Sequence, residues 1–421
     1  MTRRKLLQTS GPALAGAMAL PALAEAIQAS SRTYQRPRLK ITDVRTAMVL
    51  VHGPQAHIRI YTDQGLVGQG ESTDAAEGTP ALIHSFRDAL IGKDPLNVEA
   101  IWEELRRNVF SGPQGGQYMT ALSGLEIALW DLAGKALGMP VYQLLGGKFR
   151  DKVRIYLDTD MEDNMGPEAE LKMAFAKEHG FSAAKIDIDA AEDPNRFDRF
   201  NRTANNAEMD RMLREVRHVR EKLDAKIELG VDMHAFYDAP TGKRVAKELE
   251  PFHLLWLEEP VPAENIEAMA EIKRSTNTPI ATGENLYTRW GYMELMEKRA
   301  VDILQPDFQK AGGLAEAKKI ANLAETYYIP LAPHCVVSPV GLMASVHACA
   351  TFPNFLALEW HWVNYPDLWK NWVKEGEIIE KGFVTVPDRP GLGVEMNDEV
   401  AKKAQMPGTS WFEPHGAESW G

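Results

Sequence analysis

The hydrophobic pattern in the first part of the chain changes from a period of two to a period of three or four. Apolar and polar residues alternate over residues 39–72, which predicts antiparallel strands. Three later segments place apolar residues three or four positions apart, which predicts helices, and Gly138 with Pro140 predicts where the last one ends. Strands followed by helices indicate an α+β domain, which we place at residues 38–150.

From residue 151 onward, short apolar runs alternate with amphipathic helical stretches. The series continues past the five or six strands of an open sheet and has no glycine-rich phosphate loop. We therefore predict an α/β fold, a parallel (β/α)-barrel over residues 151–365, and expect residues 366–421 to leave the barrel and join the first domain. The eight strand-like runs are VRIYLD, AAKIDID, KIELGVDMH, LLWLEEP, PIATGEN, VDILQPD, IPLAPH and FLALEW.

Composition and charge narrow the possible functions. The chain has 421 residues, of which 44% are hydrophobic and 25% charged, a balance typical of a globular protein with more than one core. Its formal net charge is −12 and no dense block of Lys and Arg interrupts its body, so we expect no nucleic-acid partner. The two cysteines, Cys335 and Cys349, are too few for a disulfide framework.

The first residues have the features of an export signal. Arg3 and Arg4 precede an apolar run rich in Gly and Ala, and residues 22–24 give the small-x-small pattern of a cleavage site. We predict a twin-arginine-like signal peptide at residues 1–26, with a general secretory signal as the alternative because residues 5–7 lack the preferred aromatic ending. The protein is then exported or periplasmic, and no membrane span is left after the signal is removed.

Polar side chains end the predicted barrel strands at a spacing of one β/α unit, about 25 residues. Three consecutive ones are carboxylates, Asp232, Glu258 and Glu284, and the ends of barrel strands converge on the barrel axis. A single acidic residue in such a place is more often solvated or a helix N-cap. Three converging carboxylates repel one another unless a cation neutralises them, and hard oxygen ligands suit Mg2+. The spacing predicts a Mg2+ site with coordination positions open for a substrate.

These motifs resemble the enolase superfamily and, within it, the mandelate racemase subgroup. The resemblance covers residues 39–395 and implies that the first domain caps the barrel, with a loop around His52 closing the site over the substrate. It implies that Asp232, Glu258 and Glu284 bind Mg2+, and it suggests an even-numbered homo-oligomer. The matching strings are GLEIALWDLAGKALGMPVYQLLGG in the first domain and ELGVDMH, WLEEPVP, ATGENLYTRW, QPDFQKAGG and PLAPH in the barrel.

Asp307 and His334 resemble the Asp–His dyad of this superfamily. A carboxylate that binds one imidazole nitrogen fixes the tautomer and raises the basicity of the other nitrogen, which can act as a general base. A lone histidine on an apolar strand is more often a core residue. The presence of Asp307 one β/α unit earlier favours a role as general base for His334. Glu359 resembles the residue that hydrogen-bonds the substrate carboxylate, and for this its own carboxyl group has to be protonated.

The second barrel strand distinguishes between reaction outcomes. Racemases of the subgroup carry Lys-x-Lys in this strand, whereas this chain reads Lys185-x-Asp187, so the second lysine base is absent. Lys185 is still expected to contact the substrate carboxylate, and Asp187 to contact the substrate. His234 lies two positions after Asp232, on the same face of the strand, and resembles the general acid of galactonate-type dehydratases. A structural or metal-supporting role is the alternative for His234.

A base on one side and an acid on the other suit the dehydration of a small-molecule sugar acid. His334 takes the proton at C2 and His234 protonates the C3 hydroxyl, which gives a 2-keto-3-deoxy acid. An epimerase, racemase or cycloisomerase that uses the same enolate is one alternative. A catalytically silent exported protein that binds sugar acids is another. Trp290, which follows a strand end, is expected to line the substrate pocket.

Overall fold

The computed structural model describes residues 36–107, 115–190, 193–361 and 366–414. The chain divides into Met1–Arg38 and a compact unit, Leu39–Gly421, which contains every helix and strand of the described residues. The predicted signal peptide, residues 1–26, lies outside the described residues, so it stays a prediction. Among the described residues, no helix combines the length and the apolar character that crossing a membrane requires.

The first domain contains an antiparallel sheet with a long helix packed against it. The strands pair in the order β1-β2-β3, as the alternating pattern predicts. Helix α5 shares one hydrophobic core with this sheet, and Gly138 ends it with a φ of 66°, a left-handed conformation that favours glycine. The elements are β1 (Ile41–Leu50), β2 (Pro54–Thr62), β3 (Val67–Ser72), α2 (Thr79–Ser85), α3 (Arg87–Leu90), α4 (Val98–Arg107), α5 (Gly116–Leu137) and α6 (Val141–Leu144).

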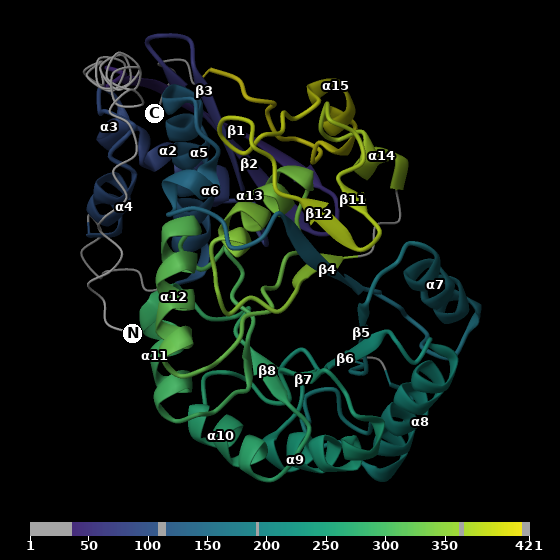
Figure 1. Ribbon diagram of the computed structural model, residues 1–421. Helices are drawn as coiled ribbons and strands as arrows, with labels where there is room; N and C mark the ends of the chain where they lie inside the picture. The colour runs from purple at the N-terminus through teal and green to yellow at the C-terminus, as the bar shows by residue number, and fades with distance from the viewer. Residues whose placement is uncertain (1–35, 108–114, 191–192, 362–365, 415–421) are drawn as a thin grey trace, which may run out of the picture. The chain divides into compact units, whose positions relative to one another are not determined.

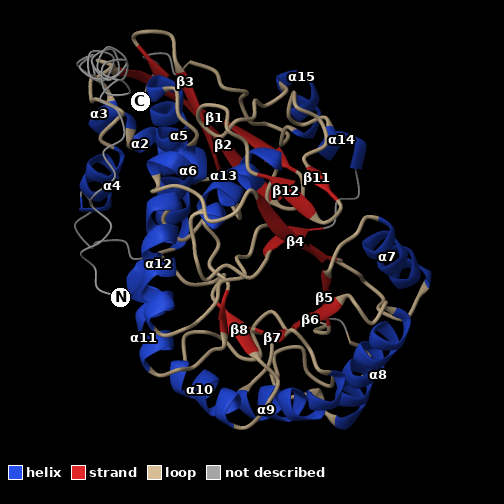
Figure 2. Ribbon diagram, in the orientation of Figure 1, coloured by secondary structure: helices blue, strands red, loops and turns tan. Residues whose placement is uncertain are grey.

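The second part of the chain forms the (β/α)-barrel. Figure 1 shows α7 to α12 in chain order around the strands, and Figure 2 shows the strands inside this ring of helices. The parallel pairing runs from β4 to β9, and β10 pairs with β4. The strands are β4 (Lys152–Asp158), β5 (Ala183–Asp187), β6 (Glu228–Asp232), β7 (Trp256–Glu258), β8 (Ile280–Thr282), β9 (Ile303–Leu304) and β10 (Leu358–His361). The helices are α7 (Pro167–Glu178), α8 (Asn206–Lys222), α9 (Ala239–Glu248), η1 (Glu250–Phe252), α10 (Ile266–Arg274), α11 (Thr288–Glu297), α12 (Leu314–Thr326) and α13 (Pro339–Ala350).

The seventh of the eight predicted strands is reduced to a single position. Leu331 forms isolated parallel bridges to Leu304 and Phe355, so it fills the gap between β9 and the chain before β10. Pro330 and Pro333 flank it, and proline has no backbone N–H to donate to a strand ladder. The strand-like composition of this run therefore gives the correct position in the barrel but overstates the extent of the strand.

A small apolar cluster fills the interior of the barrel. Its largest members are the fully buried Tyr156 and Trp256, whose rings meet edge to face at 5.0 Å between centroids. Gly230 makes room for this packing, because a Cβ atom on it would lie 2.8 Å from the Trp256 ring. The polar residues near the C-terminal ends of the strands therefore lie at the end of a packed core rather than in an open channel.

The C-terminal segment contacts both the barrel and the first domain. Strand β12 pairs antiparallel with β4, and isolated bridges join β1 to Gln405 and Trp411. The segment contains α14 (Pro366–Lys370), β11 (Ile379–Glu380), β12 (Phe383–Thr385), α15 (Asp398–Ala401) and η2 (Lys402–Ala404).

A buried carboxylate of the first domain binds the N-terminus of a barrel helix. Glu126, in α5, accepts hydrogen bonds from the backbone N–H groups of Leu314 (2.8 Å) and Ala315 (2.9 Å) at the start of α12. Free N–H groups and the helix dipole favour an anion there. Gly313 has a φ of 88°, and a Cβ atom on it would collide with the Glu126 carboxylate. Burial raises the pKa of Glu126 to about 7, so the carboxylate is mostly ionised at pH 8.

We predict that Glu126→Gln lowers the free energy of unfolding by about 1–3 kcal/mol, because the amide NH2 group would face a buried backbone N–H. The measurement is urea-induced unfolding at pH 8. Glu99→Gln is the matched control, since Glu99 also pairs with α12, through Lys319, but is exposed, and surface pairs contribute about 1 kcal/mol or less. Equal losses in the two variants would contradict the role assigned to Glu126.

Candidate active site

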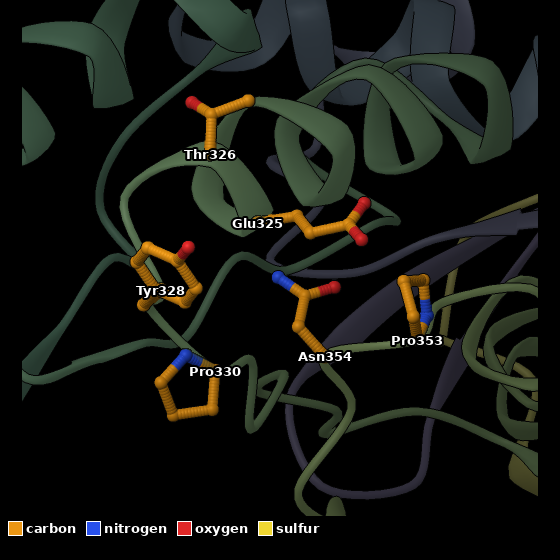
Figure 3. Close-up of a pocket in the computed structure, with 6 residues that line it drawn as sticks. All are labelled: Glu325, Thr326, Tyr328, Pro330, Pro353 and Asn354. Atoms are coloured by element: carbon orange, nitrogen blue, oxygen red, sulfur yellow. The ribbon is translucent and has the colours of Figure 1, made fainter.

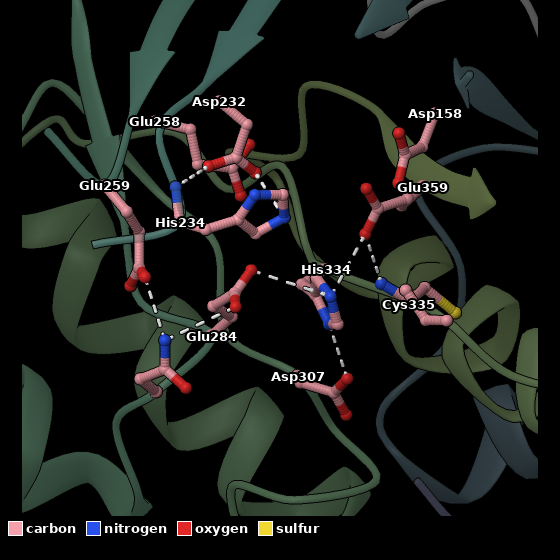
Figure 4. Close-up of polar contacts among 12 residues, drawn as sticks. Asp158, Asp232, His234, Glu258, Glu259, Glu284, Asp307, His334, Cys335 and Glu359 are labelled. Carbon is pink, nitrogen blue, oxygen red and sulfur yellow. Dashed lines mark hydrogen bonds and ion pairs between the residues drawn. The ribbon is translucent and has the colours of Figure 1, made fainter. Parts of the chain in front are cut away.

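Three acidic side chains meet at the C-terminal ends of neighbouring barrel strands. Asp232 ends β6 and lies in register with Glu258, which ends β7, and Glu284 follows two residues after the end of β8. Each offers a carboxylate oxygen, and these three oxygens lie within 4.8 Å of one another. Figure 4 shows the side chains converging from their separate strands. The structure thus brings together the three ligands predicted from the spacing of the motifs.

The chemistry of this cluster fits a divalent cation. Oε1 of Glu258 and Oε2 of Glu284 are buried and have no hydrogen-bond partner among the described residues, which is costly for a carboxylate oxygen. Burial raises the pKa of Glu258 well above its ordinary value, and the nearby Asp232 raises it further. A cation bound between the three carboxylates would satisfy these oxygens and offset the repulsion.

Lys185 lies at the centre of a larger set of carboxylates. Its Nζ is 2.9 Å from Glu359, 3.0 Å from Asp232, 3.6 Å from Glu258 and 3.7 Å from Asp158. Burial disfavours its charge, but these carboxylates outweigh burial and raise the pKa of Lys185 well above its ordinary value. Lys185 is therefore a fixed positive charge of the site.

Glu359 differs from the expectation that its carboxyl group is protonated. It forms an ion pair with Lys185 and accepts a hydrogen bond of 2.7 Å from the backbone N–H of Cys335. Burial raises its pKa, but the opposing effects of Lys185 and His334 are larger and lower the pKa to about 2. Glu359 is thus ionised in this arrangement, chiefly because the ammonium group of Lys185 lies beside it.

His334 and Asp307 form a hydrogen-bonded pair at the edge of the cluster. Nδ1 of His334 lies 2.7 Å from Oδ2 of Asp307, and the other carboxylate oxygen accepts the backbone N–H of Gln309 at 2.8 Å. Nε2 of His334 faces the site, 3.6 Å from Glu284 and 3.8 Å from Glu359. The ring is thus held by one nitrogen and presents the other, as a general base requires.

The first domain holds the loop that carries His334. Glu71, the penultimate residue of β3, accepts hydrogen bonds from the backbone N–H groups of Ser338 (2.8 Å) and Gly341 (2.9 Å), at the start of α13. Thr73 donates a hydrogen bond of 2.8 Å to the carbonyl oxygen of Val336. The position of His334 therefore depends on contacts between the two domains.

His234 faces the cluster from the loop that follows β6, two residues beyond the end of the strand, rather than from the strand itself as expected. Its Nδ1 lies 2.8 Å from Asp189, and its Nε2 lies 3.7 Å from Oδ2 of Asp232. The backbone of His234 has a φ of 42°, which is strained for a residue with a side chain, and the backbone N–H donates to Asp232 at 2.8 Å. Figure 4 shows the rings of His234 and His334 approaching the carboxylates from two different parts of the barrel.

His52, in the β1–β2 loop of the first domain, reaches the barrel next to this site. Its ring lies 4.4 Å from the ring of His361, between centroids, and Nε2 of His361 lies 3.8 Å from Asp158. Burial and the neighbouring His361 lower the pKa of His52 to about 3, so its ring is neutral. The loop predicted to close the site therefore does lie beside the ends of β4 and β10.

Asp187 lies in the site, whereas the contacts of Trp290 are with arginine side chains. Asp187 is in register with Asp232, and the oxygens of these two carboxylates and a nitrogen of His234 form a second group that could hold a metal ion. Trp290 is 41% exposed on α11, and the guanidinium groups of Arg106 and Arg289 lie over its ring. Trp290 therefore belongs to a cation–π cluster, and the expectation that it lines the substrate pocket stays a prediction.

Two residues that lie in the site, Asp158 and Asp189, were not predicted from the sequence. Asp158 is the last residue of β4 and only 4% exposed, and the strand-end rule that found Asp232 also identifies it. Asp189 lies two positions after Asp187, and side chains two positions apart in an extended segment point to the same side. This alternation could have placed Asp189 near the site. Neither residue matches a motif of the resemblance.

A cavity at the other end of the barrel lacks this chemistry. It has a volume of about 580 Å³ and lies where α12 ends and the chain enters the Leu331 position (Figure 3). Glu325 is its only charged lining residue among the described ones, and no histidine lines it. The candidate active site is therefore the carboxylate cluster at the C-terminal strand ends. The lining residues are Glu325, Thr326, Tyr328, Pro330, Pro353 and Asn354.

Comparison with protein families gives an independent view of the same chain. Residues 29–146 match the N-terminal domain of the mandelate racemase / muconate lactonizing enzyme family, and residues 168–400 match the enolase C-terminal domain-like family. The chain is an enzyme of the mandelate racemase / muconate lactonizing enzyme family, within the enolase superfamily.

Individual relatives cover nearly the whole chain. D-xylonate dehydratase of Haloferax volcanii is 40% identical over 89% of this chain and 91% of its own length. D-galactonate dehydratase of Pectobacterium atrosepticum is 35% identical over 85% of this chain and 92% of its own. Among solved structures, a mandelate racemase/muconate lactonizing enzyme-like protein from Rubrobacter xylanophilus is 42% identical, with a TM-score of 0.85 over 90% of this chain and all of that chain.

We predict that MgCl2 raises the thermal unfolding temperature of the wild-type protein and that Glu284→Gln removes most of this shift. A ligand present at about 100 times its Kd stabilises a folded protein by about 2.7 kcal/mol, which is readily measured by calorimetry. Glu294→Gln is the control, because Glu294 is an exposed carboxylate on α11 that pairs with Lys298. An undiminished Mg2+ effect in Glu284→Gln would exclude the three-carboxylate site.

Proposed function

We propose that this protein is a Mg2+-dependent sugar-acid dehydratase that acts on an aldonate. The observation that carries the proposal is the placement of two imidazoles, His334 and His234, on the same carboxylate cluster, each with Nδ1 bound to an aspartate and Nε2 facing the cluster. Removal of a proton and loss of a hydroxyl group need a base and an acid at one substrate, and this geometry supplies one of each.

Charge is the main obstacle to the first step. Loss of the proton next to a carboxylate places a second negative charge on the same group, so the ordinary acidity of that C–H bond is very low. Mg2+ held by Asp232, Glu258 and Glu284 would act as a Lewis acid and offset that charge. The ammonium group of Lys185, which already contacts two of these carboxylates and Glu359, lies close enough to attract the anionic substrate.

The two histidines then divide the proton transfers. Nε2 of His334 accepts the C2 proton, and Asp307 holds its Nδ1–H and stabilises the resulting imidazolium. The electron pair of the C2–H bond forms the enolate. Its collapse breaks the C3–O bond while Nε2 of His234 gives a proton to the departing oxygen. Water and an enol result, and the enol tautomerises to the 2-keto-3-deoxy acid.

The second strand supports elimination over a two-base reaction. Asp187 stands two residues after Lys185, and its carboxylate faces His234 and Asp232 instead of supplying a second basic amine. The two named relatives are dehydratases of a pentonate and a hexonate, which supports an aldonate of five or six carbons as the substrate. From the sequence of residues 1–26, we also propose that the enzyme works outside the cytoplasm.

We expect the mature protein, screened with MgCl2 against four- to six-carbon aldonates and aldarates, to form a 2-keto product from D-xylonate, D-galactonate or a close stereoisomer. The assay traps the 2-keto acid as its semicarbazone. Deuterium uptake at C2 without loss of water would instead indicate an epimerase or cycloisomerase. Tight binding of a sugar acid with no turnover would indicate a binding protein.

We expect His334→Asn and His234→Asn to separate the two proton transfers. Both variants should lose dehydration by at least about 10²-fold, the usual contribution of general acid–base catalysis. In D2O, His334→Asn should also lose exchange of the C2 proton, whereas His234→Asn should keep a measurable part of it. If both variants lose exchange and dehydration to the same degree, the assignment of acid and base is wrong.

A further inference from the structure

We propose that Asp189 is a positioning residue that orients His234, so that a second Asp–His pair works opposite the Asp307–His334 pair. The inference rests on the proposed function, in which His234 protonates the leaving hydroxyl. It goes beyond that function by assigning a role to a carboxylate that matches no motif of the resemblance. The observation that carries it is the contact of 2.8 Å between Nδ1 of His234 and Oδ1 of Asp189.

The ring of His234 needs an external partner to stay in place. Its side chain is 43% exposed, whereas that of His334 is 10% exposed, so packing restrains it much less. The backbone at this point is well fixed, because the N–H of His234 donates to Asp232 and the N–H of Ala235 donates to the carbonyl oxygen of Glu259 at 3.0 Å. A fixed backbone does not fix the side-chain torsions of an exposed imidazole. Among the described residues, Asp189 is the hydrogen-bonding partner of the ring.

Asp189 is anchored through both backbone polar groups of the preceding residue, Ile188. The N–H of the preceding residue, Ile188, donates to the carbonyl oxygen of Asp232 at 3.0 Å, so the segment after β5 is tied to the strand that leads to His234. The carbonyl oxygen of Ile188 accepts from Arg211 at 2.9 Å. The carboxylate of Asp189 is 18% exposed and therefore starts from a defined position rather than a mobile one.

The two Asp–His pairs have the same internal arrangement. In each, the aspartate binds Nδ1 and leaves Nε2 directed at a carboxylate of the predicted metal site, at 3.6 Å from Glu284 for His334 and at 3.7 Å from Asp232 for His234. An aspartate at Nδ1 fixes which nitrogen faces the substrate. In the elimination, the Nε2–H bond of His234 breaks as the new O–H bond forms and the C3–O bond breaks, while the proton on Nδ1 of His234 stays there and is donated to Asp189 in a hydrogen bond.

The test compares Asp189→Asn with the matched control Asp198→Asn. Asp198 is an exposed aspartate in the same connection between β5 and α8, so the control removes the same charge from the same segment. For Asp189→Asn we expect kcat for dehydration to fall by about 10²-fold, within the usual range for a general acid, with KM changed by less than about threefold. The control should retain wild-type kcat and KM.

Two further readouts distinguish orientation of the acid from a structural role. Exchange of the C2 proton in D2O depends on His334, so it should stay within about threefold of wild type in Asp189→Asn. Elimination of fluoride from a 3-deoxy-3-fluoro aldonate, followed with a fluoride electrode, should also be largely retained, because fluoride departs without a proton from His234. Loss of dehydration alone supports the positioning role.

Two results would overturn the inference. One is dehydration by Asp189→Asn at the rate of the control, and the other is an equal loss of dehydration, exchange and fluoride elimination. Either can occur while the wild-type protein dehydrates a sugar acid, so the inference can fail while the proposed function stands. Absence of dehydration by the wild-type protein and by Asp198→Asn would instead reject the proposed function.

Discussion

The structure around the site depends on the balance of charge among carboxylates that are buried together. Barrel strands deliver Asp158, Asp232, Glu258 and Glu359 to one region, and each is at most 4% exposed. Lys185 contacts all four, but one ammonium group cannot neutralise four carboxylates. The remaining negative charge favours the binding of a divalent cation by this arrangement. The same cation would then be available to an anionic substrate.

The first domain takes part in the geometry of the site through buried carboxylates at helix N-termini. Glu71 binds the start of α13 and Glu126 binds the start of α12, and both helices directly follow strand positions of the barrel. His334 lies four residues before Ser338, which Glu71 holds. The position of His334, the proposed general base, is therefore set partly by a domain that contributes none of the three clustered carboxylates.

Much of the fold and of the site could be predicted from the sequence, because both follow from the repeated β/α unit of the barrel. A residue at the end of each strand has a fixed place in a barrel, so Asp232, Glu258, Glu284, Asp307 and His334 could be grouped before any coordinates were known. Asp158 obeys the same rule and was overlooked.

Other features depend on contacts that spacing does not encode. Protonation of Glu359 is decided by its ion pair with Lys185, a residue far away in the sequence. Trp290 follows a strand end, but the helix that carries it turns its ring toward Arg106 and Arg289. Pro330 and Pro333 limit the extent of the seventh strand. Proline cannot donate a backbone hydrogen bond, and whether this ends a strand depends on the strands that pair with it.

The central claim is that Asp232, Glu258 and Glu284 hold one divalent ion, with His234 and His334 beside it. Anomalous diffraction from crystals soaked in MnCl2 tests this most directly, because Mn2+ takes the same hard oxygen ligands as Mg2+. The account predicts a single anomalous peak bounded by those three carboxylates. A peak between Asp187, Asp232 and His234 would contradict it, since the histidine would then be a ligand and could not serve as the acid.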